Sequence, residues 1–137
     1  IITQILDGLK QIRVGDLTPT RDLNYVTDTC HGFLALAKCD QSIGKEVNIS
    51  SNFEISMIDI LDMIKELLKV KVDFITDEQR IRPKNSEVFR LWGDNSLLVN
   101  LTDWKPLYNL EKGLKKTIEW FSKPENLIKY KSGIYNI

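Results

Sequence analysis

Four basic side chains lie in the polar stretch 76–93, and side chains of this kind can hold phosphate. They are Arg80, Arg82, Lys84 and Arg90. A guanidinium presents a planar fork of donors that matches phosphate oxygens, and it keeps its charge at every physiological pH. Loops of this length inside a small domain are often functional. The stretch therefore predicts a site for a phosphate-bearing ligand, and solvated loop arginines are the alternative.

The sequence lacks the residues that a dinucleotide, zinc or serine-nucleophile site would need. The glycines are spread over positions 8, 15, 32, 44, 93, 113 and 133. They cannot form the glycine-rich turn that lets a backbone approach a pyrophosphate, so this chain alone is not expected to bind NAD. His31 is the only histidine. Because zinc needs several converging ligands and a serine nucleophile needs a paired histidine and acid, we expect neither site.

Composition sets the class of protein. Of the 137 residues, 42% are apolar, and Lys plus Arg equals Asp plus Glu at 19 each. Such a chain suits one modest globular domain. Because it has no net charge, it has no overall electrostatic field that would attract nucleic acid or an anionic membrane. No apolar run approaches the ~20 residues of a membrane span. If Cys30 and Cys39 lie on one helix, they are too far apart for a disulfide, and free thiols favour a cytoplasmic location.

Periodicity and capping residues predict a single domain of alternating helices and strands. Helices are expected over 1–11, 27–38, 56–68, 95–101 and 110–121, and strands over 11–15, 21–26, 45–49 and 70–75. Ser56, Asp94 and Asn109 are the expected helix caps, and Pro124 is expected to end the last helix. The strands are too few for a complete doubly wound sheet. The expected fold class is α/β with mixed short strands and helices.

The first residues predict that the sequence is a piece of a longer protein. The chain opens without a methionine, and Ile1, Ile5 and Leu9 share one helical face from the start. Nothing caps this helix. We therefore expect a fragment.

Four segments, in this order, resemble one family. They are Thr20–Asp28 with the pattern Arg-Asp-x-x-Tyr-Val-x-Asp, the strand end Val47–Ser50, the stretch Arg80–Ser96 that begins Arg-x-Arg-Pro-x-x-Ser-Glu-Val, and Trp104–Trp120 with Trp-x-Pro before Leu-Glu-x-Gly-Leu. Leu23 stands where an aromatic residue is usual, and Ser50 replaces the common glycine. Together the segments resemble the extended short-chain dehydrogenase/reductases, the NAD-dependent epimerase/dehydratase family.

The resemblance implies that 1–137 is the C-terminal substrate-binding portion of a Rossmann-type fold, and that an N-terminal half outside the sequence binds NAD and carries the chemistry. Relatives oxidise a sugar at C4, eliminate water across C5 and C6, and return the hydride to C6. The Arg80–Val88 segment and the closing Tyr135–Ile137 look most like dehydratases of nucleotide-activated N-acetylglucosamine, of the legionaminic-acid type. A 4-epimerase and a binding module without catalysis are the alternatives. The parent is expected to be a homodimer, and the fragment inactive.

The resemblance also suggests which arginines hold a nucleotide-diphosphate sugar. Arg82 matches a diphosphate-binding arginine and is the first choice. Arg21 matches a second arginine that contacts phosphate. An internal ion pair of Arg21 with Asp22, Asp28 or another acid has equal weight.

Two further residues are candidate substrate contacts. Glu87 could accept hydrogen bonds from ribose hydroxyls, because a carboxylate only accepts. Its alternative is a surface pair with Arg90. Asn48 could position the substrate, although we favour a role in satisfying backbone groups at a strand end.

One motif in the chain imitates the family's catalytic pair. Tyr108 and Lys112 have the spacing Tyr-x-x-x-Lys, which works when both side chains share one helix face. Tyr108 precedes the expected cap Asn109, so it lies outside the helix. We therefore assign no catalytic residue to this chain.

The isolated chain is expected to self-associate, exchange elements or be marginally stable. A strand at 45–49 would belong to the edge of the parent sheet, and severed from it would expose unpaired backbone groups and apolar surface. Size-exclusion chromatography with light scattering measures this, and a monomer with a high melting temperature contradicts it.

Overall fold

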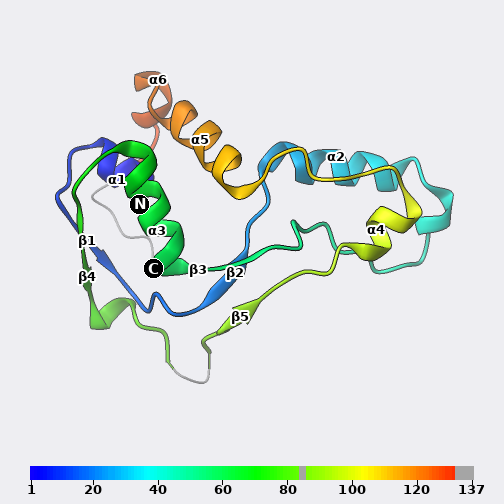
Figure 1. The fold of residues 1–137 in the computed structure, drawn as a ribbon, viewed down its shortest axis with the longest axis horizontal. Coiled ribbons are helices and arrows are strands. Elements are labelled where there is room, and N and C mark those ends of the chain that lie inside the picture. The colour runs from blue at the N-terminus through cyan, green and yellow to red at the C-terminus, as the bar shows by residue number, and fades with distance from the viewer. Residues whose placement is uncertain (84–85, 132–137) are drawn as a thin grey trace.

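Two small sheets connect the helices of this chain in a computed structural model, which describes residues 1–83 and 86–131 (Figure 1). The elements, in chain order, are α1 (Ile2–Leu6), β1 (Gln11–Val14), β2 (Thr20–Asp22), α2 (Val26–Ala37), a 3₁₀ turn (Asp40–Ser42), β3 (Glu54–Ser56), α3 (Met57–Leu68), β4 (Asp73–Thr76), a second 3₁₀ turn (Glu78–Arg80), β5 (Arg90–Leu91), α4 (Ser96–Leu101), α5 (Leu110–Phe121) and α6 (Pro124–Leu127). Strands β1 and β4 pair in parallel. The second sheet has the order β3-β2-β5, with β2 antiparallel to β3 and parallel to β5.

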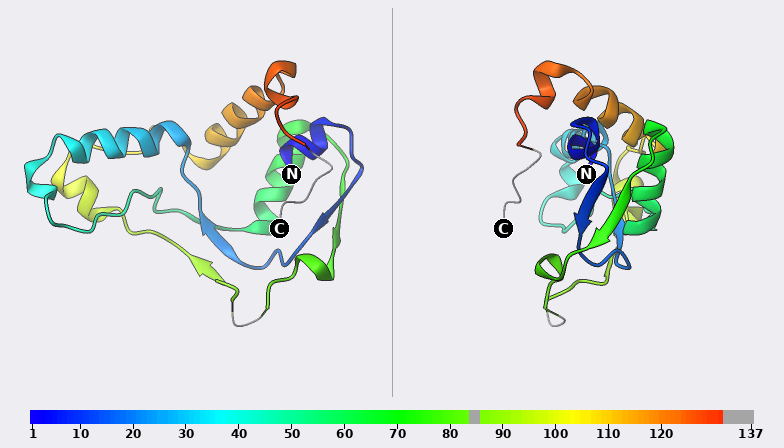
Figure 2. Two further views of the ribbon diagram at one scale, coloured as in Figure 1. Left: turned by 180° about the vertical axis from the view of Figure 1, so that it is seen from behind. Right: turned by 90° about the vertical axis from the view of Figure 1, so that its left-hand side faces the viewer.

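The elements form two lobes joined by the β3-β2-β5 sheet. Helices α1 and α3 lie with β1 and β4 in the first lobe, and α2 lies with α4 in the second (Figures 1 and 2). Helix α5 contacts both α1 and α3. The lobes are therefore joined by the middle sheet and by α5, whose Gly113 packs against Tyr25 at the start of α2.

The main core lies in the first lobe. Its buried side chains are Ile5, Ile12, Val14, Ile60, Leu61, Ile64 and Val72. Strand β1 alternates strictly, with Ile12 and Val14 inward and Gln11 and Arg13 outward, because successive side chains of a strand point to opposite faces. In the second lobe, Leu98 and Trp104 are buried.

The predicted caps of α3 and α5 are confirmed. The Ser56 side chain accepts from the Asp59 amide at 3.2 Å at the start of α3. The Asn109 side chain accepts from the Lys112 amide at 3.0 Å at the start of α5. Each bond satisfies an amide that has no partner inside its helix.

The predicted strand at 45–49 is wrong, because these residues form no ladder in the structure. Their neighbours are a helix and side-chain amides. Gly32 of α2 lies so close that a Cβ there would be 2.6 Å from the Ile49 side chain. Asn24 donates to the main-chain oxygen of Ile49 at 3.2 Å, and Asn95 donates to that of Ser50 at 2.8 Å. Side chains thus bind backbone that a neighbouring strand would otherwise bind.

Several boundaries also differ from the prediction. The first helix ends at Leu6, and the second strand is Thr20–Asp22 where 21–26 was expected. Pro124 starts α6, where its fixed φ and missing amide donor are tolerated, and α5 already ends at Phe121. Asn95 is the boundary residue of α4, but the Asp94 carboxylate accepts from the first helical amide, Ser96, at 2.9 Å as a cap does.

Within the described part of the chain, no helix combines the length and apolar character needed to cross a bilayer.

Asn109→Ala is expected to lower the free energy of unfolding by about 1 kcal/mol, because the α5 cap loses its acceptor. Asn109→Asp is the matched control, since a carboxylate caps equally well. Urea denaturation of both variants measures the difference. Equal losses for alanine and aspartate would show that the cap contributes nothing.

Candidate functional site

The middle sheet brings together two parts of the predicted site. Strand β5 lies beside β2, with Thr20 opposite Arg90 and Arg21 opposite Leu91 (Figure 1). Since β5 belongs to the 76–93 stretch, this pairing places the stretch that was predicted to bind phosphate next to Arg21.

Arg21 and Glu87, two of the predicted substrate contacts, form an ion pair. Nη2 of Arg21 lies 3.3 Å from Oε1 of Glu87, and the two side chains are 21% and 11% exposed. Nη1 of Arg21 donates to the main-chain oxygens of Thr20 at 2.7 Å and Val88 at 2.8 Å. The internal ion pair considered for Arg21 therefore forms, with the acid supplied by the neighbouring stretch.

The predicted alternative pair of Glu87 with Arg90 is wrong. Arg90 instead binds Glu54 on β3 with Nε at 2.8 and 2.9 Å from the carboxylate oxygens and Nη2 at 2.8 Å. The Thr20 hydroxyl donates to the same carboxylate. Because β2 runs between β3 and β5, the sheet places Glu54 and Arg90 within reach across Thr20. These bonds hold the pKa of Glu54 below its usual value and raise that of Arg90.

Arg82 follows the Glu78–Arg80 turn and is exposed. Across 1–83 and 86–131, its guanidinium makes no hydrogen bond or ion pair. Two other arginines are held by Asp77, with Arg80 Nε at 3.4 Å and Arg13 Nη1 at 3.8 Å from Oδ2. Arg80 and Arg90 thus form ion pairs with Asp77 and Glu54, while the guanidinium of Arg82 is available to a ligand.

Asn48 is exposed, and its side-chain amide donates to the main-chain oxygen of Asp94 at 3.4 Å. This is the kind of backbone contact that we favoured for it. Lys84, Asn85 and Tyr135–Ile137, which carry parts of the family resemblance, lie outside the described residues.

Asp22 is a residue whose importance the sequence did not reveal. Its Oδ1 accepts from the amide of Ser51 at 2.9 Å and from its hydroxyl at 2.6 Å. Its Oδ2 accepts from the amides of Asn52 at 3.0 Å and Gly93 at 3.5 Å. The sequence offered Asp22 only as an ion-pair partner for Arg21. The polar run 50–52 was the available signal, but nothing in it specifies contact with residue 22.

Asp28 likewise serves the fold. It is 1% exposed, and its Oδ2 accepts from the Tyr108 amide at 3.0 Å, while its main-chain oxygen accepts from the Trp104 indole at 3.0 Å. The ring of Tyr108 packs against that of Tyr25 in a tilted arrangement, with centroids 4.6 Å apart. Tyr108 therefore lies outside α5, as predicted, and does not share a helix face with Lys112.

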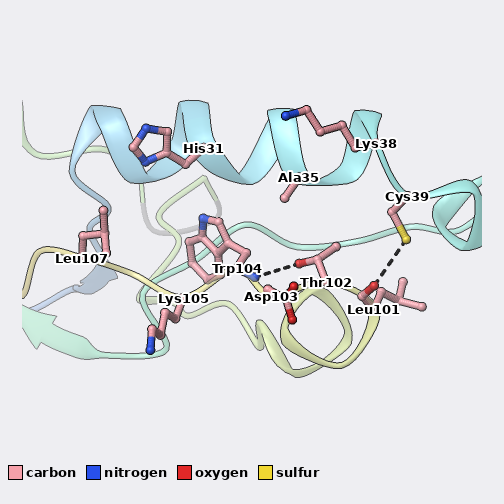
Figure 3. A pocket seen from close by; sticks show the side chains of 10 residues that line it. All are labelled: His31, Ala35, Lys38, Cys39, Leu101, Thr102, Asp103, Trp104, Lys105 and Leu107. Carbon is pink, nitrogen blue, oxygen red and sulfur yellow. Dashed lines mark hydrogen bonds between the residues drawn. The ribbon is translucent and has the colours of Figure 1, made fainter.

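A pocket of about 540 Å³ lies between α2 and the connection from α4 to α5 (Figure 3). His31, Ala35 and Lys38 lie on α2 on one side, and Figure 3 shows Trp104 facing this helix from the other side, beside Asp103 and Lys105. None of the four predicted substrate contacts lines this pocket. The candidate site is thus a separate surface, built on the middle sheet and the 76–93 stretch.

Comparison with known proteins places this geometry in a family. Residues 1–117 match the family of GDP-mannose 4,6 dehydratase. The chain belongs to this family. The predicted membership among NAD-dependent epimerases and dehydratases, and the α/β class of an extended short-chain dehydrogenase, are thereby confirmed.

The relatives of this GDP-mannose 4,6 dehydratase family member carry different activities in their names. UDP-glucuronate 4-epimerase of Thermodesulfobacterium geofontis is 30% identical over 125 residues, which cover 88% of this chain and 36% of that protein. Human dTDP-D-glucose 4,6-dehydratase is 29% identical over 111 residues, covering 74% of this chain and 29% of that protein. The chain thus spans about a third of the length of these relatives.

Solved structures in this family share the fold. The dTDP-glucose 4,6-dehydratase of Bacillus anthracis, solved in complex with NAD, is 27% identical and superposes with a TM-score of 0.75. The match covers 90% of this chain and 38% of that one. The short sheets and helices described above are therefore a known arrangement within larger family members.

Arg90→Gln is expected to raise the pKa of Glu54 toward its ordinary value, because the main bonds to the charged carboxylate are lost. In the unsubstituted protein the lowered pKa means that Glu54 contributes to stability at neutral pH, and that this contribution is lost as the pH falls through the lowered pKa. Titration of the Glu54 carboxyl carbon by NMR measures both states. Arg13→Gln, which removes a charge elsewhere on the sheet surface, is the control and should leave Glu54 unchanged.

Proposed function

We propose that this chain is the substrate-binding part of an NAD-dependent nucleotide-sugar 4,6-dehydratase, and that Arg82 contacts the substrate diphosphate. The observation that carries the proposal is an exposed arginine without a protein partner in 1–83 and 86–131, in a chain of this family. An exposed, unpaired guanidinium can bind phosphate in a bidentate way without first breaking an internal bond. The relatives named above act on UDP- and dTDP-linked sugars according to their names, which supports a nucleotide-diphosphate sugar as ligand.

Glu87 is proposed to face the ribose. Its carboxylate is an acceptor-only group that suits a diol, and its bond to Arg21 fixes one of its oxygens. Asn48 is assigned a lesser part, since its amide is bound to the Asp94 carbonyl. In this proposal residues 1–137 hold the substrate for chemistry performed by a separate N-terminal half.

NAD is proposed to bind that other half, where it would accept and return the hydride of the sugar. The Bacillus anthracis relative was solved with NAD. No residue of this chain is assigned to the cofactor, because its glycines do not form a dinucleotide-binding turn. The parent is proposed to act in the cytoplasm as a homodimer.

A 4-epimerase is the second candidate, favoured by the match to a UDP-glucuronate 4-epimerase at 30% identity. The two reactions differ in mass balance, because a dehydratase product has lost one water and an epimerase product is an isomer of the substrate. Nucleotide-activated N-acetylglucosamine incubated with the full-length protein and NAD should yield a product lighter by one water in mass spectrometry. A product of unchanged mass with inverted C4 would establish the epimerase instead.

Arg82→Ala in the full-length protein is expected to raise the Michaelis constant for the nucleotide sugar by about tenfold or more, because a hydrogen bond to a charged group is lost. Arg82→Lys keeps the charge but loses the planar fork, so its effect should be smaller. Steady-state kinetics measure both.

Lys129→Ala is the control for this experiment, since it removes one positive charge from an exposed residue just beyond α6. It should leave the Michaelis constant unchanged. An unchanged Michaelis constant in Arg82→Ala would eliminate the proposed diphosphate contact.

A further inference from the structure

Ser50 is bound by hydrogen bonds to the end of the 76–93 stretch. Its hydroxyl donates to the main-chain oxygen of Gly93 at 2.8 Å. Its own main-chain oxygen accepts from the side-chain amide of Asn95 at 2.8 Å. Ser50 and Asn95 are both 8% exposed, so these bonds are shielded from water. The point at which the stretch ends is therefore fixed by a buried polar contact with a distant part of the chain.

Gly93 is shaped to receive Ser50. A Cβ built at Gly93 would stand 2.5 Å from the Cβ of Ser50 and 2.7 Å from its Oγ, which leaves no room for any side chain there. The backbone of Gly93 does not lie in the left-handed region, so this close approach, and not its conformation, requires the glycine. The Gly93 amide donates to the carboxylate of Asp22 at 3.5 Å. Both polar main-chain groups of Gly93 are thus bound by side chains from other segments.

The residues just before Gly93 have little support from the backbone. Strand β5 is two residues long, and the Thr20 amide adds one bond to the Phe89 carbonyl at 2.8 Å. A ladder this short is marginal without further contacts. The bond from Ser50 supplies a fixed point two residues beyond β5.

The beginning of the stretch is also held by a close approach at a glycine. A Cβ at Gly15 would collide with the main-chain oxygen of Arg80. Arg82 and Glu87, which are proposed to contact the substrate, lie between this point and Gly93. A shift at either end would therefore change where these two side chains lie.

We propose that Ser50 is a positioning residue for the substrate, which acts through Gly93 to fix the end of the stretch that carries the proposed ligand contacts. This inference rests on the proposed function for its kinetic consequence. The two residues are matched in size and in polarity, because the glycine leaves space for the serine side chain and the serine hydroxyl binds the glycine carbonyl. Serine is the smallest side chain that can donate this bond.

Ser50→Ala in the full-length protein tests the hydrogen bond. The variant keeps the Cβ and loses the donor, so the Michaelis constant for the nucleotide sugar should rise about fivefold with kcat unchanged. Ser122→Ala is the matched control, since the Ser122 hydroxyl also donates to a main-chain oxygen, that of Ile118, at 2.8 Å. This control should change neither constant. An unchanged Michaelis constant in Ser50→Ala overturns the proposal.

A paired substitution tests the fit between the two residues. Gly93→Ala alone should raise the Michaelis constant by about tenfold or more, because the added methyl group and the Ser50 side chain cannot occupy the same space. Adding Ser50→Gly removes the collision and should return the constant to within about fivefold of its original value. If Gly93→Ala does not fold, recovery of a cooperative melting transition in the double variant is the supporting result. A double variant no better than Gly93→Ala overturns the matched pair.

Hydrogen exchange separates this inference from the proposed function, because it needs no ligand. The reporter is the Thr20 amide, whose bond to the Phe89 carbonyl depends on the position of the chain before Gly93. Ser50→Ala should speed exchange of this amide by about fivefold, and Arg82→Ala should not change it. If Arg82→Ala leaves substrate binding intact while Ser50→Ala frees the Thr20 amide, the proposed diphosphate contact fails and the anchoring by Ser50 stands. Unchanged exchange in Ser50→Ala overturns the anchoring.

Discussion

The side chains of one three-residue strand, β2, hold several segments of this structure together. Strand β2 is the central member of the sheet that joins the two lobes, yet Thr20–Asp22 is too short to be stable through backbone pairing alone. Each of its side chains supplies an additional bond to a neighbouring segment. Thr20 bonds to Glu54, Arg21 to Glu87, and Asp22 to the amides of the 51–52 turn and Gly93. Side chains therefore reinforce the short ladders by which this sheet joins the lobes.

This arrangement gives a physical reason for the adjacent arginine and aspartate of the family pattern. Successive side chains of a strand point to opposite faces, so Arg21 and Asp22 reach different neighbours although they are adjacent in sequence. Arg21 contacts Val88, just before β5. Asp22 contacts the turn before β3 and the amide of Gly93, just after β5. Through Arg21 and Asp22, strand β2 thus binds three other segments, at Val88, Ser51 and Gly93.

Local patterns in the sequence predicted α2, α3 and α5 and the caps of α3 and α5, but they made the first helix too long and missed α6. Ser56 and Asn109 act within three residues of themselves, so their bonds can be inferred from sequence spacing. The strict alternation of β1 is local in the same sense. The failures at the middle sheet were contacts between distant residues. The bonds of Asp22 to Ser51 and of Arg90 to Glu54 span 29 and 36 positions, and neither partner carries a sequence signal that names the other. The strand predicted at 45–49 failed for the same reason, because a ladder needs a partner that the segment's own residues do not specify.

Gly15 brings the end of strand β1 into contact with the stretch that carries Arg82. Gly15, the residue after β1, lies so close to the carbonyl of Arg80 that a methyl group would not fit between them, so the end of the buried strand packs directly against the start of the arginine-bearing stretch. Arg82 follows two residues further on, so the packing at Gly15 limits where this stretch can leave the core. If Arg82 meets the ligand as proposed, a relative that places this guanidinium elsewhere would need a change at the edge of its hydrophobic core as well as in the loop.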